Sequence, residues 1–220
     1  MKIGVLGTGM VGRTLGTSLV QRGHDVRMGS RTRGHQGARA WVAGAGERAS
    51  EGSFADASAF GDVVFNCTAG AASLRALELA GRDHLSGKIL IDVANPLDFS
   101  QGMPPTLTVC NTDSLGEQIQ RAFPEARVMK TLNTVNCNVM VNPGLVPGDH
   151  NLFLSGNDPD AKARVAHWLG EWFGWKRENI LDLGDITTAR GTEMLLPMWI
   201  RLMFALGTTG FNWRVVVGGA

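Results

Sequence analysis

Short runs of hydrophobic residues alternate with longer amphipathic stretches along most of the chain. The runs are typical of buried strands in a parallel sheet, whereas the stretches repeat their hydrophobic residues with the period of a helix. The segments predicted as strands are Lys2–Gly7, Asp25–Ser30, Asp62–Cys67, Lys88–Val93, Arg127–Leu132, Asn151–Ser155 and Ile180–Leu183, with a weaker one near Arg48–Ser50. The segments predicted as helices are Met10–Arg22, Gly37–Ala45, Phe54–Phe60, Ala71–Ala80, Leu115–Phe123 and Pro159–Phe173.

This alternation of strands and helices predicts right-handed βαβ units. The expected fold class is therefore α/β, a Rossmann-type doubly wound and mostly parallel sheet. The pattern changes after Gly184, because the rest of the chain reads as one long apolar helix followed by a tail. We therefore expect a Rossmann domain over residues 1–184 and a small helical C-terminal segment over residues 185–220.

The C-terminal helix is apolar on nearly every face between Met194 and Phe204. Such a helix is normally buried all round, and a segment this short can hardly bury it alone. We therefore expect a homodimer in which these helices pack against the partner subunit.

The strongest chemical signal is the turn after the first strand, Gly7-Thr8-Gly9-Met10-Val11-Gly12. It has the G-x-G-x-x-G spacing, follows a predicted strand and opens a predicted helix, which is the context that a dinucleotide-binding turn requires. The first glycine allows the tight turn, the second lets a pyrophosphate approach the backbone, and the third lets the helix pack against the strand. The positive end of the helix would then bind the pyrophosphate.

The end of the second strand indicates which nucleotide is preferred. An NAD site normally has Asp or Glu there, whereas this chain has Ser30, Arg31 and Thr32. A guanidinium can pair with a 2′-phosphate as a planar fork, and the hydroxyls can donate to its oxygens. We therefore expect NADP(H) as the cofactor.

Two further strand ends carry small or polar residues where ligands collect in open α/β sheets. The first is Cys67-Thr68-Ala69, whose small residues suit a dinucleotide lying across the strand ends. The second ends in Asn95-Pro96, where Asn95 either orients a carboxamide or forms an ordinary Asn-Pro turn.

Composition excludes several other classes. With 21 Lys and Arg against 20 Asp and Glu, the net charge of +1 gives no basic excess for nucleic acid. The chain shows no signal-peptide pattern and no apolar stretch long enough for a membrane span. The three cysteines are far apart and the five histidines lack ligand spacing, so we expect no metal site. These features fit a cytoplasmic protein that binds small molecules.

Candidates for proton chemistry are sparse. The chain has no tyrosine, so a Tyr-x-x-x-Lys arrangement is impossible. Lys130 and Glu193 are the charged residues that stand out in apolar surroundings. Lys130 would serve as a general acid or, as we favour, extend to solvent or pair with a carboxylate.

Several segments together resemble the reductases that exchange hydride between NADPH and the deazaflavin coenzyme F420. The cytosolic reductase domain of animal ferric reductases is a more distant relative. The segments that carry the resemblance are Met1–Gly9, Gly29–Arg31, Asp92–Pro96, Lys130–Thr134 and Glu193–Pro197. The resemblance covers nearly the whole chain.

The resemblance implies that Thr8, Ser30 and Arg31 hold the 2′-phosphate end of NADPH. It also implies that the segment Asn133 to Cys137, with Val135 between them, lies beside the nicotinamide. Some members have His in place of Asn133 and Ala in place of Cys137, so the acceptor is left open between F420 and a flavin. The C-terminal segment would then contribute the acceptor pocket.

A direct hydride transfer between stacked rings needs orientation and exclusion of water rather than a protein base. The leading interpretation is therefore an NADPH-dependent reductase of a deazaflavin or flavin. One alternative is a reductase of a small imine or carbonyl substrate, although such enzymes usually append a larger helical domain. Another is a non-catalytic NADP(H)-binding regulatory protein.

Overall fold

A computed structural model describes residues 1–218 of the 220-residue chain. Its main sheet has eight strands in the order β10-β9-β8-β5-β4-β1-β2-β3. The strands are β1 (Lys2–Leu6), β2 (Asp25–Ser30), β3 (Ala49–Ser53), β4 (Val63–Asn66), β5 (Ile89–Asp92), β8 (Arg127–Thr131), β9 (Leu152–Gly156) and β10 (Ile180–Gly184). The predicted α/β class and mostly parallel sheet are confirmed.

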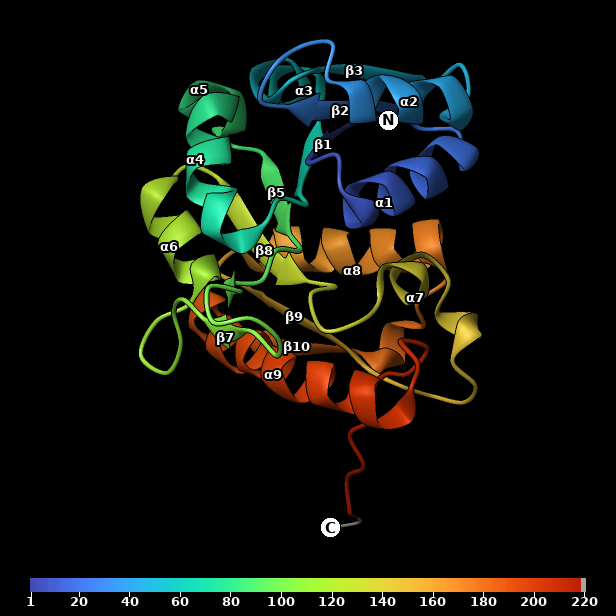
Figure 1. Cartoon of the computed structure of the whole chain (residues 1–220), viewed down its shortest axis with the longest axis vertical. Coiled ribbons are helices and arrows are strands. Elements are labelled where there is room, and N and C mark those ends of the chain that lie inside the picture. Colours follow the sequence, from blue (N-terminus) through green and yellow to red (C-terminus); the bar gives the residue numbers. More distant parts are fainter. Residues whose placement is uncertain (219–220) are drawn as a thin grey trace.

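Six neighbouring strands, in the order β8-β5-β4-β1-β2-β3, run parallel and form the Rossmann arrangement (Figure 1). The strand β9 runs antiparallel to β8, and β10 is parallel to β9. The amino ends of β9 and β10 therefore lie at the same sheet edge as the carboxyl ends of the other six. A short antiparallel pair, β6 (Leu97–Asp98) and β7 (Thr106–Leu107), was not expected from the sequence.

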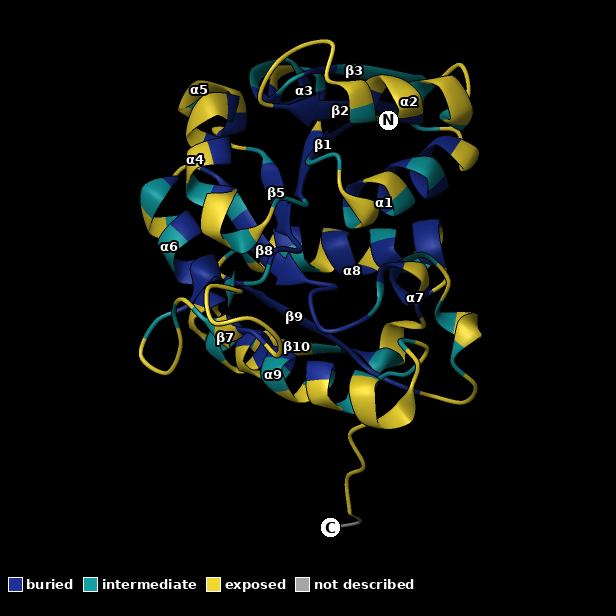
Figure 2. Ribbon diagram, viewed as in Figure 1, coloured by how far each residue is buried: buried dark blue, intermediate teal, exposed yellow. Residues whose placement is uncertain are grey.

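Helices cover both faces of the sheet and bury two hydrophobic cores (Figure 2). One core lies under α1 (Met10–Gln21), α2 (Gln36–Ala45), α7 (Cys137–Val141) and α8 (Pro159–Phe173). The other lies under α3 (Phe54–Phe60), α4 (Gly70–Ala80), α5 (Arg82–Leu85) and α6 (Leu115–Ala122). The fold is thus a three-layer α/β sandwich, in which the central strands are buried on both faces.

Local signals in the sequence explain the ends of the best-defined helices. Ser53 and Asp56 form a capping box that starts α3, because each side chain accepts from the other's backbone N–H. Asp158 accepts from the third residue of α8, Pro159 occupies its first position, and Gly174 ends it in the left-handed conformation. These helices consequently begin and end within a residue of the predicted bounds.

The C-terminal segment consists of the 3-10 helix η3 (Ile186–Thr188), the helix α9 (Ala189–Leu206) and a tail. Leu196 and Ile200 on α9 are buried, whereas Met198 and Phe204 are exposed. The tail is held where the backbone carbonyl of Trp213 accepts from the backbone N–H of Asn151 and the backbone N–H of Val215 donates to Oδ1 of Asn151. Beyond these contacts it leaves the body of the molecule (Figure 1). Residues 219–220 of the predicted segment lie outside the described residues.

The spacing of Trp168, Trp172 and Trp175, at i, i+4 and i+7, predicts that they share one helix face. Trp168 and Trp172 do lie on α8, stacked with ring centroids 5.1 Å apart. Trp175 lies beyond the end of that helix, because Gly174 stops it. It nevertheless folds back into the same core, where its indole N–H donates to the carbonyl of Met140 over 2.9 Å.

Candidate functional site

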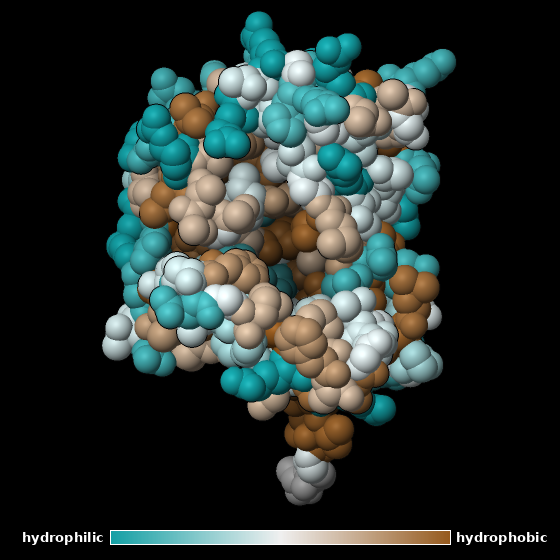
Figure 3. All heavy atoms as spheres, viewed as in Figure 1, coloured by the Kyte–Doolittle hydropathy of each residue, from teal (hydrophilic) through white to brown (hydrophobic). Residues whose placement is uncertain are grey.

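A cavity of about 440 Å³ opens at the carboxyl ends of β1, β2 and β4. In the space-filling view this face is recessed near its middle, in the region where β1, β5 and β8 end in Figure 1 (Figure 3). Ligands of open α/β sheets bind at this edge. The residues that line the cavity are Gly7, Thr8, Gly9, Ser30, Arg31, His35, Phe54, Cys67, Thr68, Ala69, Ala72, Arg75, Ala76 and Leu79.

The glycine turn has the geometry that its spacing predicts. Gly7 has a φ of 119°, which side-chain-bearing residues rarely adopt. A Cβ atom on Gly12 would lie 2.2 Å from the carbonyl oxygen of Gly7, so only glycine lets the helix approach the strand this closely. A Cβ atom on Gly9 would meet nothing within 4 Å, and that open space is where a ligand can reach the backbone.

The helix α1 presents its positive end to this cavity. The N-cap residue Gly9 has no side chain, and the first turn, which contains Met10 and Val11, carries no acidic residue. The backbone N–H of Arg13 makes the first hydrogen bond of the helix, to the carbonyl of Gly9. The amides before it have no carbonyl partner within the helix, so they can bind an anion.

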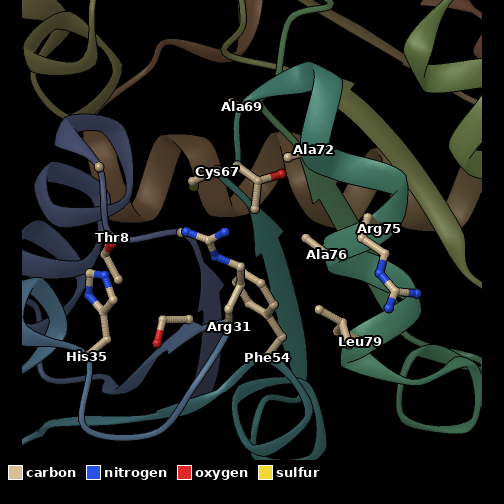
Figure 4. A pocket seen from close by; sticks show the side chains of 14 residues that line it. Thr8, Arg31, His35, Phe54, Cys67, Ala69, Ala72, Arg75, Ala76 and Leu79 are labelled. Carbon is tan, nitrogen blue, oxygen red and sulfur yellow. The ribbon is translucent and has the colours of Figure 1, made fainter.

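Arg31 reaches across the middle of the cavity, with Thr8 and His35 on one side and Ala76 and Leu79 on the other (Figure 4). It is exposed and makes no hydrogen bond or ion pair with another residue in the range 1–218. Its guanidinium is therefore available to a ligand. This arrangement fits the fork that a 2′-phosphate needs.

The neighbouring Arg33 behaves differently. Its guanidinium forms a bidentate pair with Asp56, with Nε 2.6 Å from one carboxylate oxygen and Nη2 2.5 Å from the other. This bonding, aided by Ser53, holds the pKa of Asp56 well below its ordinary value. Arg33 is therefore engaged within the protein, which leaves Arg31 as the arginine of this turn that can bind a phosphate.

The hydroxyl groups of the turn are arranged less simply than predicted. Ser30 is buried, and its hydroxyl donates to the carbonyl of Thr32 over 2.6 Å. The hydroxyl must therefore rotate before it can donate to a phosphate. Thr32 is exposed but does not line the cavity.

Thr68 connects the cavity to the interior of the sheet. Its hydroxyl lies 2.7 Å from Oδ1 of Asn66, whose amide donates to Asp92 over 2.7 Å. The neighbouring Cys67 has its thiol pKa raised by burial and by the charge of Asp92. The thiol is thus held neutral, so Cys67 contributes surface rather than reactivity.

Asn95 and Asn133 come together from two strand ends. The amide of Asn95 donates to the backbone carbonyl of Asn133 over 2.8 Å, and the amide of Asn133 donates back to Oδ1 of Asn95 over 2.9 Å. Val135 and Cys137 lie just beyond, with side chains buried in a hydrophobic core. A place beside the nicotinamide stays a prediction for these four residues, which do not line the cavity.

Sequence reasoning missed six residues that line the cavity. His35 directly precedes α2 and caps it by accepting from the backbone N–H of Gly37, so its position before a predicted helix was a usable signal. No local pattern marked the others, because they meet the nucleotide turn only through tertiary packing. They are Phe54 on α3 and Ala72, Arg75, Ala76 and Leu79 on α4.

Two negative findings concern residues 1–218. They contain no group of three or more histidine, cysteine, aspartate or glutamate side chains that could hold a metal ion. Their helices include none with both the length and the apolar character that crossing a bilayer requires.

Comparison with known proteins agrees with this geometry. The sequence profile of the family "NADP oxidoreductase coenzyme F420-dependent" matches residues 2–96, which contain the glycine turn and the Arg31 turn. A crystal structure from Arthrobacter sp. FB24, provisionally described as an F420-dependent NADP-reductase, is 53% identical. It aligns over 99% of this chain and 100% of its own, with a TM-score of 0.93. The chain belongs to the coenzyme F420-dependent NADP oxidoreductase family.

Two more distant relatives are longer than this chain. The metalloreductase STEAP3 of Rattus norvegicus is 28% identical over 212 residues, which are 94% of this chain but 39% of STEAP3. A reductive aminase from Aspergillus terreus, solved in complex with NADPH, is 19% identical with a TM-score of 0.65, over 93% of this chain and 62% of the aminase. The aminase shows a shared fold alone, and this family member spans less than two thirds of either protein.

Membership of the family makes the chain an NADP-dependent oxidoreductase. The predicted family and the predicted cofactor class are thereby confirmed.

Proposed function

We propose that this protein transfers hydride between NADP(H) and a deazaflavin, coenzyme F420, or a flavin. The observation that carries the NADP(H) part of the proposal is Arg31 in the cavity, unpaired among residues 1–218, next to a glycine turn and with no carboxylate among the lining residues. The 53% identity with a protein described as an F420-dependent NADP-reductase supports the same acceptor class.

The residues of the cavity fit a dinucleotide. A Cβ atom at Gly9 would fill the space through which a pyrophosphate approaches the amides of Met10, Val11 and Gly12. Arg31, with Thr8 and Ser30 beside it, would hold the 2′-phosphate. We name this part the nucleotide end: the turn Gly7–Gly12 together with Ser30–Thr32.

The other end of the proposed site lies along the same sheet edge. Cys67, Thr68 and Ala69 follow β4, and the paired Asn95 and Asn133 follow β5 and β8. An extended dinucleotide that starts at the glycine turn crosses these strand ends in that order. We name the loops after β5 and β8, which carry Asn95 and Asn133, the reaction end.

The protein's own part in the reaction is to bind and to orient. When bound, NADPH supplies the hydride and the acceptor ring receives it. Asn133 would position a ring amide by accepting from it, and Val135 and Cys137 would form the apolar wall that excludes water. Orientation alone accounts for large rate gains, so a site without a positioned proton donor is sufficient for this chemistry.

Two other functions make different predictions. A reductase of small imines or carbonyl compounds shares the fold, as the aminase shows, and a regulatory protein would bind NADP(H) without turnover. The test follows the loss of NADPH absorbance with F420, then with flavin mononucleotide, then with a cyclic imine. Turnover with either ring acceptor supports the proposal, and turnover with the imine alone contradicts it. NADPH binding without any turnover favours the regulator.

We also propose that residues 185–220 form a segment distinct from the Rossmann domain and that the protein is a homodimer. The exposed apolar residues of α9 support this, since Met194, Met198, Phe204 and Leu206 are each at least 39% exposed in the single chain. Monomers rarely leave such residues together on one helix. Light scattering at micromolar concentration should give twice the chain mass of 23.5 kDa, and a value of 23.5 kDa contradicts the proposal.

A further inference from the structure

Three charged side chains meet in the interior between the sheet and α9. The ammonium of Lys130, on β8, lies 2.8 Å from a carboxylate oxygen of Asp92 and 2.8 Å from one of Glu193. All three residues are at most 1% exposed. Glu193 also accepts from the backbone N–H groups of Leu115 and Gly116, over 2.8 and 3.0 Å, so it joins α9 to the start of α6.

Burial by itself lowers the pKa of Lys130, but the two carboxylates outweigh this effect and hold the pKa above its ordinary value. The lysine is therefore charged, and its raised pKa makes it a poor proton donor near neutral pH. Buried ion pairs of this kind often contribute less stability than apolar residues of the same size. Stability alone therefore does not account for this cluster.

The cluster holds two strand ends together. Besides Asp92, Lys130 donates to the backbone carbonyl of Ala94, which directly precedes Asn95. Three residues after Lys130, Asn133 and Asn95 exchange their two hydrogen bonds. The loops that leave β5 and β8 are therefore fixed to each other at two successive points.

Between these two points the backbone is strained. Leu132 has a φ of 63°, in the left-handed region, and its side chain is buried. A residue other than glycine adopts this conformation at a cost of about 1 kcal/mol or more, and it persists only where the surroundings hold it. Lys130 on one side and Asn133 on the other provide that restraint.

The restraint also fixes the orientation of the Asn133 side-chain amide. Asn95 must turn its amide nitrogen toward the backbone carbonyl of Asn133, so its Oδ1 faces the nitrogen of the Asn133 side chain. The side-chain oxygen of Asn133 then has no hydrogen-bond partner among residues 1–218. It is left as an acceptor for a donor such as a ring carboxamide.

We propose that Lys130, held by Asp92 and Glu193, is a positioning residue for hydride transfer: it fixes the ends of β5 and β8 so that Asn133 presents its side-chain oxygen to the nicotinamide. This inference rests on the proposed function. It also implies that α9 affects the reaction from a distance, because Glu193 is the contact through which α9 holds Lys130.

The test uses the full-length double variant Lys130→Met/Glu193→Gln. The native cluster carries one positive and two negative charges, and the variant keeps only Asp92, so the net charge of −1 is unchanged. The matched control is Lys162→Met/Asp182→Asn, which removes another Lys–Asp pair at 2.8 Å. That pair lies between α8 and the carboxyl end of β10, at the sheet edge opposite the site.

Four measurements are made on each variant: thermal unfolding, NADPH titration, stopped-flow hydride transfer at saturating NADPH, and amide hydrogen exchange of residues 132–137. We expect a folded double variant with NADPH affinity within about threefold of the native value and hydride transfer slowed by about tenfold or more. Exchange should rise at residues 132–137 and stay unchanged at the glycine turn. The control should match the native protein throughout.

Native transfer rates with native exchange at residues 132–137 overturn the inference. If the double variant does not fold, Lys130→Arg is judged by the same criteria, since its planar group keeps the charge but cannot reproduce three contacts made by an ammonium. If the native protein transfers hydride to no acceptor, the proposed function fails. The exchange data on the apo protein then decide separately whether Lys130 orders the loop.

Discussion

Arg31 and Asn133 lie at the nucleotide end and the reaction end of the proposed site, and their surroundings differ. Arg31 is exposed and has no protein partner within residues 1–218. Asn133 is 3% exposed and is bonded to Asn95, 38 positions earlier in the chain. At the nucleotide end the backbone of the glycine turn shapes the site, and the Arg31 side chain makes no bond to the other residues in this range. At the reaction end buried side chains hold one another in place.

The difference indicates how each end responds to substitution. At the nucleotide end a side chain can be removed without disturbing its neighbours, so the loss should be confined to binding. At the reaction end the same change removes a partner from a buried network, so geometry should suffer more than affinity.

Arg31→Ala should give the largest effect. We expect NADPH to bind about 10- to 150-fold more weakly, because a charged bidentate contact contributes roughly 1.5–3 kcal/mol. NADH lacks the 2′-phosphate and should be almost unaffected. Fluorescence titration with both nucleotides measures this, and Arg33→Ala is the control, since Arg33 is engaged by Asp56. Equal losses for the two nucleotides would remove Arg31 from the phosphate site.

Asn133→Ala should separate chemistry from binding. We expect hydride transfer to slow by about 10- to 100-fold, a loss of about 1.4–2.7 kcal/mol that is typical of a positioning contact. NADPH affinity, held at the other end, should change little. Stopped-flow transfer at saturating NADPH checks the expectation, with Asn138→Ala on the exposed side of α7 as the control. A collapse of affinity with normal transfer would reverse the assignment of the two ends.

Gly9→Ala tests the proposed contact between the glycine turn and the pyrophosphate without changing the charge of the protein. Gly9 has a φ of −75°, which alanine adopts readily, and the added methyl group meets no protein atom. The fold should therefore be unaffected, while NADPH and NADH should both weaken by about tenfold because the methyl group occupies the space for the pyrophosphate. Gly44→Ala on α2, where the space is also open, is the control. Unchanged affinity for both nucleotides would place the pyrophosphate elsewhere.

The smallest effect should come from a surface pair away from both ends. The hydrogen bonds from Arg121 lower the pKa of Asp113 to about 2. Because the folded pKa lies below the unfolded value, the pair stabilises the fold above about pH 4, and this contribution is lost as the pH falls toward 2. Solvent screens the pair, so Asp113→Asn should cost less than about 1 kcal/mol at pH 7.

Urea unfolding of the native protein and of Asp113→Asn at several pH values checks this. The difference between them should vanish between about pH 4 and pH 2. Asp83→Asn, at an exposed position of α5, is the control. A constant difference at all pH values would mean that packing, and not charge, is what the substitution removes.

The same contrast explains which parts of the site could be predicted from the sequence. The glycine turn and the Ser30-Arg31 pair were predictable, because a strand, a tight turn and a helix are specified by residues next to one another. The pairing of Asn95 with Asn133 and of Lys130 with Glu193 was not, since each joins elements distant in sequence. Lys130 stood out as a charge among apolar residues, but nothing local identified Asp92 and Glu193 as its partners.

The fold likewise has features that could be predicted from the sequence and features that could not. Strand and helix positions were predicted within a few residues, because buried parallel strands are short apolar runs. The reversed direction of β9 was not predicted, since an apolar run reads the same in either direction. The exposed side of α9 was also not visible in a pattern that is apolar throughout.

The reversal at β9 has a practical consequence for protein engineering. The connection from β9 to α8, at Asn157 and Asp158, lies at the edge of the sheet opposite the site, whereas the loop that enters β9 lies on the same side as the site. An affinity tag or a reporter domain inserted at Asn157 would therefore stand a full strand length from bound nucleotide. The same insertion before Leu152 would separate β9 from His150 and Asn151, which hold the tail through Asn212 and Trp213.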